Sequence, residues 1–217
     1  MNIQHRYSIL AKARQIAGNE TLEHLASRKF LGAPLAEDIR RWLREQPAHQ
    51  VLLLDFGGIR TMNGSVAQEV GPLIMEAVAQ SSVLEHRYPL FGLDNADITD
   101  SLALSFAHLN HAALGVVTVP MERTPVVAPI VQEQGRTMVV LGVLTRQNEQ
   151  ILELAEQFVH QEKLLTSDQL EILDFLAHVS AAARSKRLTE LYTRRLLAFR
   201  ENPLNPKERL FLPPWRL

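Results

Sequence analysis

The chain has 217 residues, 46% of them hydrophobic, with a formal net charge of −1 at pH 7 and no cysteine. This composition suits one large or two small folded domains, and it excludes disulfides and thiolate metal sites. The longest apolar runs, such as residues 139–144, are far shorter than a membrane span, and no apolar signal-peptide core opens the chain, so we expect a cytoplasmic protein outside the membrane.

The first half of the sequence alternates predicted helices with short apolar strands. Leu35, Ile39 and Leu43 are spaced by four among charged residues, which predicts an amphipathic helix. A run of valine and leucine then predicts a buried strand, and a loop with three glycines follows it. Such alternation indicates an α/β sandwich with helices packed on a sheet. The predicted elements are helix 33–46, strand 49–56, helix 66–81, strand 88–93, helix 97–114 and strand 115–120.

The character of the sequence changes after residue 120. Residues 121–135 hold two prolines and a closing glycine without a helical period, and we place a domain junction there. The predicted organisation is a first domain at 1–121, a linker at 122–138 and a second domain at 139–217.

The second domain begins with three predicted helices. The third helix has Ser180 in position to cap its first turn. Two short strands around a Pro/Asn turn follow. Helix, helix, turn, helix and hairpin make a winged helix-turn-helix, so the expected fold class is α+β, an α/β sandwich plus a winged helix. The predicted ranges are helices 146–165, 166–177 and 181–196, and strands 197–200 and 209–212.

Positive charge gathers at the end of this nearly neutral chain. Residues 181–217 hold nine basic and three acidic side chains, whereas residues 145–180 hold two basic and seven acidic ones. A basic third helix followed by a basic hairpin is the charge distribution of a nucleic-acid-binding domain. The acidic stretch would then face away from DNA. The alternative is that each arginine belongs to a solvated surface without a ligand.

The third helix has a predicted core side and a predicted DNA side. Leu188 and Leu191 must face the core, which puts Lys186 and Arg187 on the other side. Small residues at the helix start allow close approach to a groove, and Arg187 can reach a phosphate or a guanine edge. Basic residues of the hairpin suit phosphate or minor-groove contact. The predicted DNA-binding residues are Ser180, Ala182, Ala183, Arg184, Lys186, Arg187, Arg194, Arg200, Lys207 and Arg209.

A motif in the third helix resembles a known family. Residues 185–191, Ser-Lys-Arg-Leu-Thr-Glu-Leu, resemble the Ser-x-Arg-Leu-x-x-Leu pattern of bacterial winged-helix regulators. The resemblance covers roughly residues 140–217 and implies double-stranded DNA as partner and transcription regulation as function. The turn at 177–180 lacks the usual glycine, and the second helix is longer than usual. The register of the recognition helix is therefore open by about one residue.

The first domain carries a second resemblance. In residues 51–70 an apolar strand ends in Asp55, a loop follows, and Ser65 begins the next helix. This arrangement resembles the STAS-like family, relatives of the anti-sigma-factor antagonists, and the upstream pair Ser27-Arg28 resembles a pair found in STAS-like members. The resemblance covers residues 5–120 and makes Ser65 a possible phosphoacceptor. Asn63, Gly64 and Val66 depart from the family loop, and we favour Ser65 as a helix cap.

No enzyme motif is present. The sequence lacks a P-loop, a dinucleotide glycine fingerprint and a nucleophile elbow, so we expect no catalysis, no cofactor and no metal. The expected function is a DNA-binding transcriptional regulator that forms a homodimer through its STAS-like domain. The alternative is a non-catalytic interaction switch, in which that domain binds a kinase or another partner.

Overall fold

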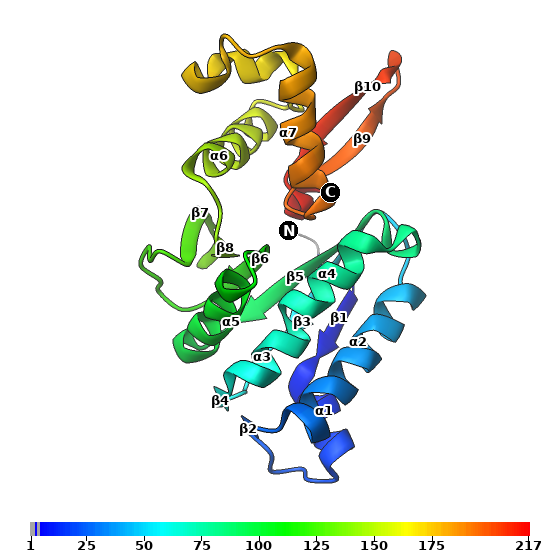
Figure 1. Cartoon of the computed structure of the whole chain (residues 1–217), viewed down its shortest axis with the longest axis vertical. Coiled ribbons are helices and arrows are strands. Elements are labelled where there is room, and N and C mark those ends of the chain that lie inside the picture. Colours follow the sequence, from blue (N-terminus) through cyan, green and yellow to red (C-terminus); the bar gives the residue numbers. More distant parts are fainter. Residues whose placement is uncertain (1–2, 4) are drawn as a thin grey trace. The chain divides into compact units, whose positions relative to one another are not determined.

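The computed structural model describes residues 3 and 5–217, apart from the side chain of Lys207 (Figure 1). The chain divides into two compact units, Ile3–Val143 and Leu144–Leu217. Both contain helices and strands, in agreement with the expected mixture of α and β structure. None of the helices in the described part of the chain has the length and hydrophobicity of a membrane span.

The N-terminal unit is built on a six-stranded mixed sheet. Its first four strands are parallel, and the last two are antiparallel to their neighbours. The strands lie in the order β1-β3-β5-β6-β8-β7. Their bounds are β1 His5–Ser8, β3 Gln50–Asp55, β5 Arg87–Leu93, β6 Ala112–Val117, β7 Val127–Glu133 and β8 Arg136–Gly142.

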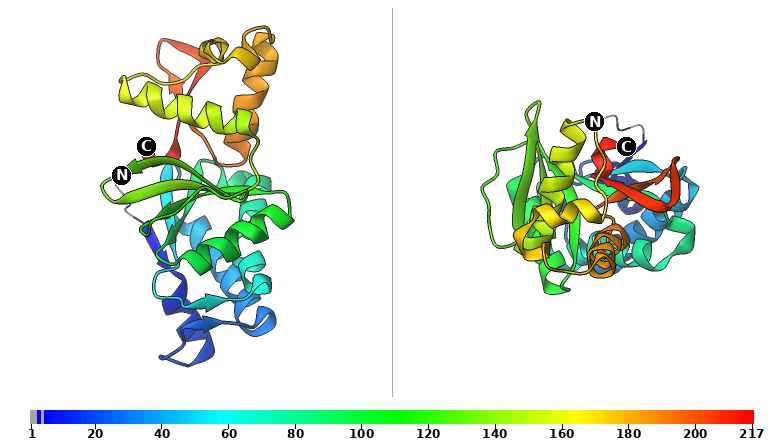
Figure 2. Two further views of the ribbon diagram at one scale, coloured as in Figure 1. Left: turned by 90° about the vertical axis from the view of Figure 1, so that its left-hand side faces the viewer. Right: turned by 90° about the horizontal axis from the view of Figure 1, so that it is seen from above.

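The α-helices described for this unit pack on one face of its sheet (Figures 1 and 2). Right-handed crossovers between parallel strands that are added in one direction place every helix on the same side. The core lies between helices and sheet, where Phe91 stacks near Phe56 and meets the edge of Phe106. The helices are α1 Ile9–Ala17, α2 Ala33–Glu45, α3 Gly64–Val70, α4 Pro72–Gln80 and α5 Ala96–His108. Smaller elements are the strand pair β2 His24–Leu25 and β4 Thr61–Met62, the π-helical turn η1 Arg28–Gly32 and the 3₁₀ turn η2 Ser82–Leu84.

The linker predicted at 122–138 is wrong, because β7 and the start of β8 occupy it. Pro129 lies in β7, which is the edge strand of the sheet, where a missing N–H costs no ladder hydrogen bond. The two strands are joined by Gln134 and Gly135, both with positive φ, as a two-residue type I′ hairpin turn requires. The boundary between the units therefore falls at residues 143 and 144.

Two predicted helices of the N-terminal unit have different limits from those expected. The helix at 66–81 is divided at Gly71 into α3 and α4, because Pro72 supplies no N–H to continue the ladder. The helix at 97–114 ends at His108, and residues 112–114 already belong to β6. Asn110 makes this sharp change with a positive φ of 55°.

The C-terminal unit places two helices beside an antiparallel hairpin (Figure 1). A single bridge between Leu165 and Phe211 adds the segment after α6 to the edge of the hairpin. The elements are α6 Arg146–His160, the 3₁₀ turns η3 Asp168–Ile172 and η4 Asp174–Leu176, α7 Ala181–Thr193, β9 Ala198–Asn202, β10 Asn205–Leu212 and the 3₁₀ turn η5 Pro214–Arg216.

The helix predicted at 166–177 is replaced by the two 3₁₀ turns. Leu170, Leu173 and Leu176 are spaced by three, which matches the three residues per turn of a 3₁₀ helix rather than 3.6. Leu173 has an extended backbone between the turns and separates them. Leu170 and Leu176 are nonetheless buried.

Candidate nucleic-acid interface

Helix α7 begins where the sequence indicated. The Ser180 Oγ accepts a hydrogen bond from the Ala183 N–H at 3.3 Å, which confirms Ser180 as the N-cap. Leu188 and Leu191 are buried, as expected. The exposed residues of α7 are Ala181, Ala182, Ser185, Lys186, Thr189, Glu190 and Thr193, whereas Ala183 and Arg187 are half-buried.

Ser185 and Thr189 were not among the predicted contact residues, although both lie on the exposed side of α7. Thr189 follows the buried Leu188 directly and lies three residues after Lys186. Helical spacing therefore already placed it beside Lys186 on the solvent side.

Arg184 is turned into the C-terminal unit and is only 5% exposed. Its guanidinium donates to the Ser167 carbonyl at 3.0 Å and to the Val179 carbonyl at 2.6 Å. It also pairs with Glu171 at 2.6 Å. This burial and these bonds argue against the predicted DNA contact, because the donors of Arg184 are already engaged.

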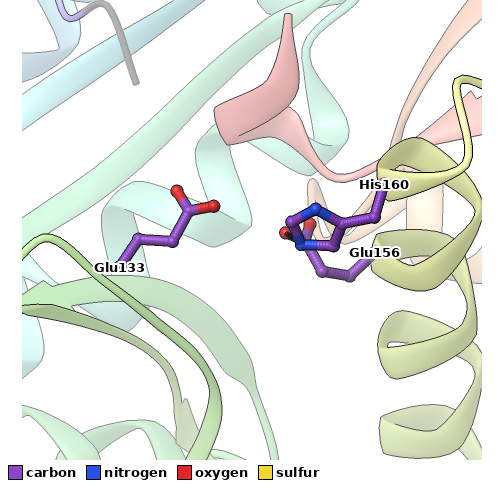
Figure 3. A group of neighbouring side chains, drawn as sticks. All are labelled: Glu133, Glu156 and His160. Atoms are coloured by element: carbon purple, nitrogen blue, oxygen red, sulfur yellow. Dashed lines mark ion pairs between the residues drawn. The ribbon is translucent and has the colours of Figure 1, made fainter.

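The acidic stretch before α7 neutralises part of the basic segment from within the same unit. Glu171 faces Arg184, and the buried Glu156 accepts from the Arg216 Nε at 3.0 Å and from the Trp215 Nε1 at 3.2 Å. The Glu156 Oε1 also lies 3.3 Å from the Nε2 of His160, one turn further along α6. Figure 3 shows both side chains on this helix. The surplus of positive charge on the surface is therefore smaller than the sequence count suggests.

The hairpin presents two exposed arginines. Arg209 stacks over the Phe199 ring, with its guanidinium carbon 4.8 Å from the ring centre. Phe199 in turn packs edge-on against Tyr192 of α7. Arg200 donates to the main-chain oxygen of Leu217 at 3.1 Å. Lys207 was also predicted to contact DNA, but its side chain lies outside the described part of the structure.

Two further arginines follow the last turn of α7. Arg194 is half-buried, and this burial lowers the pKa of its guanidinium, an effect that the nearby Glu190 opposes. Arg195 is buried and donates to the Tyr192 carbonyl at 3.2 Å. Of this pair, only Arg194 therefore retains a surface position for the predicted contact.

Grooves flank α7 on two sides. One lies toward α6, and the other lies toward the hairpin and the segment before η3. Thr189 lines both grooves and therefore lies between them on the helix surface. The first groove is lined by Asn148, Lys186, Thr189, Glu190, Leu191, Thr193 and Arg194. The second is lined by Ser167, Ser185, Thr189, Glu208, Arg209 and Phe211.

In the N-terminal unit, the cap of α3 is Asn63 and not Ser65. The Asn63 Oδ1 accepts from the Val66 N–H at 3.0 Å, and its Nδ2 donates to the Ala26 carbonyl at 2.5 Å. Ser65 is the second residue of the helix, and its hydroxyl donates to the Asn63 Oδ1 at 2.8 Å. The sequence prediction erred by two residues because asparagine caps a helix as well as serine does.

The pair Ser27-Arg28 lies next to this helix. The Ser27 Oγ accepts from the Phe30 N–H at 3.2 Å, and Arg28 pairs with the buried Glu69 of α3 at 2.6 Å. A separate groove runs between α3 and α5, beside Leu104, which is 59% exposed. Its lining residues are Gly64, Gln68, Ser101, Leu104, Ser105 and His108.

No family model, no curated protein and no solved structure matches this chain.

Proposed function

We propose that the protein is a DNA-binding transcriptional regulator whose C-terminal unit is a winged helix-turn-helix. The observation that carries this proposal is the position of α7, which turns Ala182, Lys186 and Thr189 to solvent beside a hairpin with Arg200 and Arg209. The element order of α6, the Leu165 bridge, two short helical turns, α7 and a hairpin supports the same assignment.

In this proposal α7 enters the major groove and the hairpin follows the backbone. Ala182 at the start of α7 lets the helix approach closely, and Lys186 meets a phosphate or a guanine edge. Arg209, held against Phe199, is suited to a phosphate because stacking orients its guanidinium before binding. Arg184 serves instead to hold α7 in place.

Salt dependence of DNA binding tests this proposal. Duplex binding by the full chain should weaken steeply as salt rises, because phosphate contacts release counterions. Lys186→Ala should weaken binding by about 1–3 kcal/mol if Lys186 meets a base, or lower the salt slope by about one if it meets a phosphate. Titration of labelled DNA by fluorescence anisotropy measures both quantities.

Lys163→Ala is the matched control, since Lys163 is an exposed lysine of the same unit outside α7 and the hairpin. The control should bind like the unaltered chain. If Lys186→Ala and Arg187→Ala combined change neither affinity nor salt slope while the fold persists, α7 is not the DNA contact.

The N-terminal unit is proposed to be STAS-like and to form the homodimer. Two-fold symmetric regulators read two half-sites, which raises both affinity and specificity. Light scattering of the full chain with and without DNA tests this assignment, and a monomeric mass in both samples contradicts it.

A second candidate function is a non-catalytic interaction switch in the N-terminal unit. The groove between α3 and α5 favours it, because the exposed Leu104 lies in it near the start of α3, where Ser65 is found. A phosphate on Ser65 would displace the hydroxyl proton that now binds Asn63. Mass spectrometry of the protein from its native host tests this candidate, which requires a phosphate on Ser65.

A further inference from the structure

Thr189 lies on the side of α7 that faces solvent. It is exposed and lines both grooves beside the helix. Lys186 precedes it by three residues, which is about 4.5 Å along the helix axis. Side chains at these two positions can therefore meet neighbouring base pairs.

The hydroxyl group of Thr189 is already engaged with the helix backbone. Its Oγ1 donates to the Ser185 carbonyl at 3.0 Å, and the Thr193 Oγ1 donates to the Thr189 carbonyl at 2.9 Å in the same manner. A hydroxyl has one proton to donate. Thr189 therefore cannot donate to the acceptors of a base unless it gives up this bond, and it can offer only its methyl group or an oxygen lone pair.

We infer that Thr189 recognises a thymine through contact between its methyl group and the thymine C5-methyl group. The thymine methyl is the one apolar group that a base pair presents in the major groove. The neighbouring Glu190 already provides a carboxylate acceptor on this side of α7, so the methyl group, and not an oxygen lone pair, is what Thr189 adds beside it. This inference rests on the proposed function and adds to it a specified base, next to the base pair that Lys186 meets.

The experiment begins with selection of bound duplexes from a random pool by the full chain. The selected sequences should share a thymine at one fixed position. Replacement of this thymine by uracil removes only the methyl group and should weaken binding about fourfold, the factor that corresponds to burial of one methyl-sized group. Replacement of a thymine outside the selected positions by uracil should leave the affinity unchanged.

Two variants separate the methyl group from the hydroxyl group. Thr189→Val keeps the methyl group, so it should bind the thymine duplex like the unaltered chain. Its affinity should also fall about fourfold on the uracil duplex. Thr189→Ser keeps the hydroxyl group, so it should bind about fourfold more weakly and show no difference between thymine and uracil. Thr193→Val and Thr193→Ser are matched controls, because Thr193 makes the same backbone bond at the last residue of α7, and both should bind normally.

Other outcomes overturn the inference. If Thr189→Ser binds normally and Thr189→Val does not, the hydroxyl group makes the contact, and the proposed DNA-binding function stands. A selected site without a fixed thymine also overturns the inference, because no thymine is then recognised, and it leaves the proposed DNA-binding function standing. Absence of any salt-dependent DNA binding by the unaltered chain overturns the proposed function and this inference together, so the two failures are distinguishable.

Discussion

Asn63 joins the start of α3 to a distant part of the N-terminal unit. Its Oδ1 accepts from the first turn of the helix, and its Nδ2 donates to the Ala26 carbonyl. Asn63→Ala removes both bonds and should lower the free energy of unfolding by about 0.5–2 kcal/mol, the usual cost of a lost cap. Urea unfolding of the full chain measures this change.

Ser65→Ala is the matched control for that experiment, because Ser65 donates to Asn63 but does not cap the helix. It should change the free energy of unfolding by no more than about 0.5 kcal/mol. A larger loss from Ser65→Ala than from Asn63→Ala would contradict the assignment of the cap.

Asp38 links α2 to α1 and β1 through hydrogen bonds. Burial raises the pKa of its carboxyl group, but the hydrogen bonds from Tyr7, Lys12 and Arg41 outweigh this effect, so the net pKa is lowered. The ionised form is therefore favoured in the folded state, and it contributes stability above the ordinary aspartate pKa of about 3.9. This contribution should disappear as pH falls below that value, through the lowered pKa.

Asp38→Asn tests this linkage. The variant should be less stable than the unaltered chain at neutral pH, and the difference should shrink as the solution becomes more acidic than the ordinary pKa of aspartate. Unfolding curves collected through this acid range measure the trend. A constant difference at every pH would show that ionisation of Asp38 makes no contribution.

At the scale of elements, Arg184 attaches α7 to the segment that precedes it. Its guanidinium reaches the carbonyls of Ser167 and Val179 and the carboxylate of Glu171. Arg184→Ala leaves these two carbonyls without that donor and should cost about 1–3 kcal/mol of stability. Thermal unfolding checks the loss. Lys186→Ala, an exposed change in the same helix, should stay within about 0.5 kcal/mol and serves as control.

The contacts of Arg184 also explain the limit of the sequence prediction for α7. Arg184 was predicted to contact DNA, although it lies four and seven residues before Leu188 and Leu191, a spacing that puts it on the same buried side of the helix. Its carbonyl partners depend on the path of η3 and of the turn before α7, which helical spacing does not encode. The sequence therefore identified the helix, its cap and its exposed lysine, but not which basic residues are engaged inside the unit.

Elements of the N-terminal unit were predictable where a single sequence pattern, such as an apolar run or a regular spacing, marks the whole element. The apolar run of β3 and the spacing by four in α2 gave both elements with nearly correct limits. Helices α3 and α4 appeared as one because the apolar pattern continues through Gly71. A side chain there would place its Cβ 2.8 Å from the Ala67 carbonyl oxygen. Pro72, the next residue, is the local signal for this break, but it does not interrupt the apolar spacing from which a single helix was predicted.

At the scale of the whole molecule, the boundary at Val143 makes a direct prediction. A chain that ends at Val143 should unfold cooperatively, whereas one that ends at Met121, the limit expected from the sequence, should not. The shorter chain lacks Val127, Val139 and Leu141, which belong to the core. Each fully buried side chain of this type contributes about 1.5–3 kcal/mol, and whole domains are stable by only about 5–15 kcal/mol.

Urea unfolding followed by circular dichroism distinguishes the two chains. The shorter one also loses the strand that pairs with β6, which leaves an apolar edge open to aggregation. Cooperative unfolding of both chains with equal midpoints would show that β7 and β8 are dispensable for the N-terminal unit.

The sequence misplaced this boundary for a physical reason. Prolines and the lack of a helical period are typical of linkers, but they are equally compatible with an edge strand. Only the pairing of β8 with β6, between segments separated along the chain, distinguishes the two cases. Long-range pairing of this kind is not visible in local composition.

The strand order has a consequence for how the chain is made. Strands β1, β3, β5 and β6 join the sheet in the order of their synthesis, each beside the one before. Strand β7 breaks this sequence, since its place is beside β8 and not beside β6. As the chain leaves the ribosome, β7 must wait for the turn at Gln134 and Gly135 and for β8 to follow. Until this hairpin forms, the edge of β6 has no strand paired with it. A newly made chain can bind chaperones or aggregate through this edge during that interval.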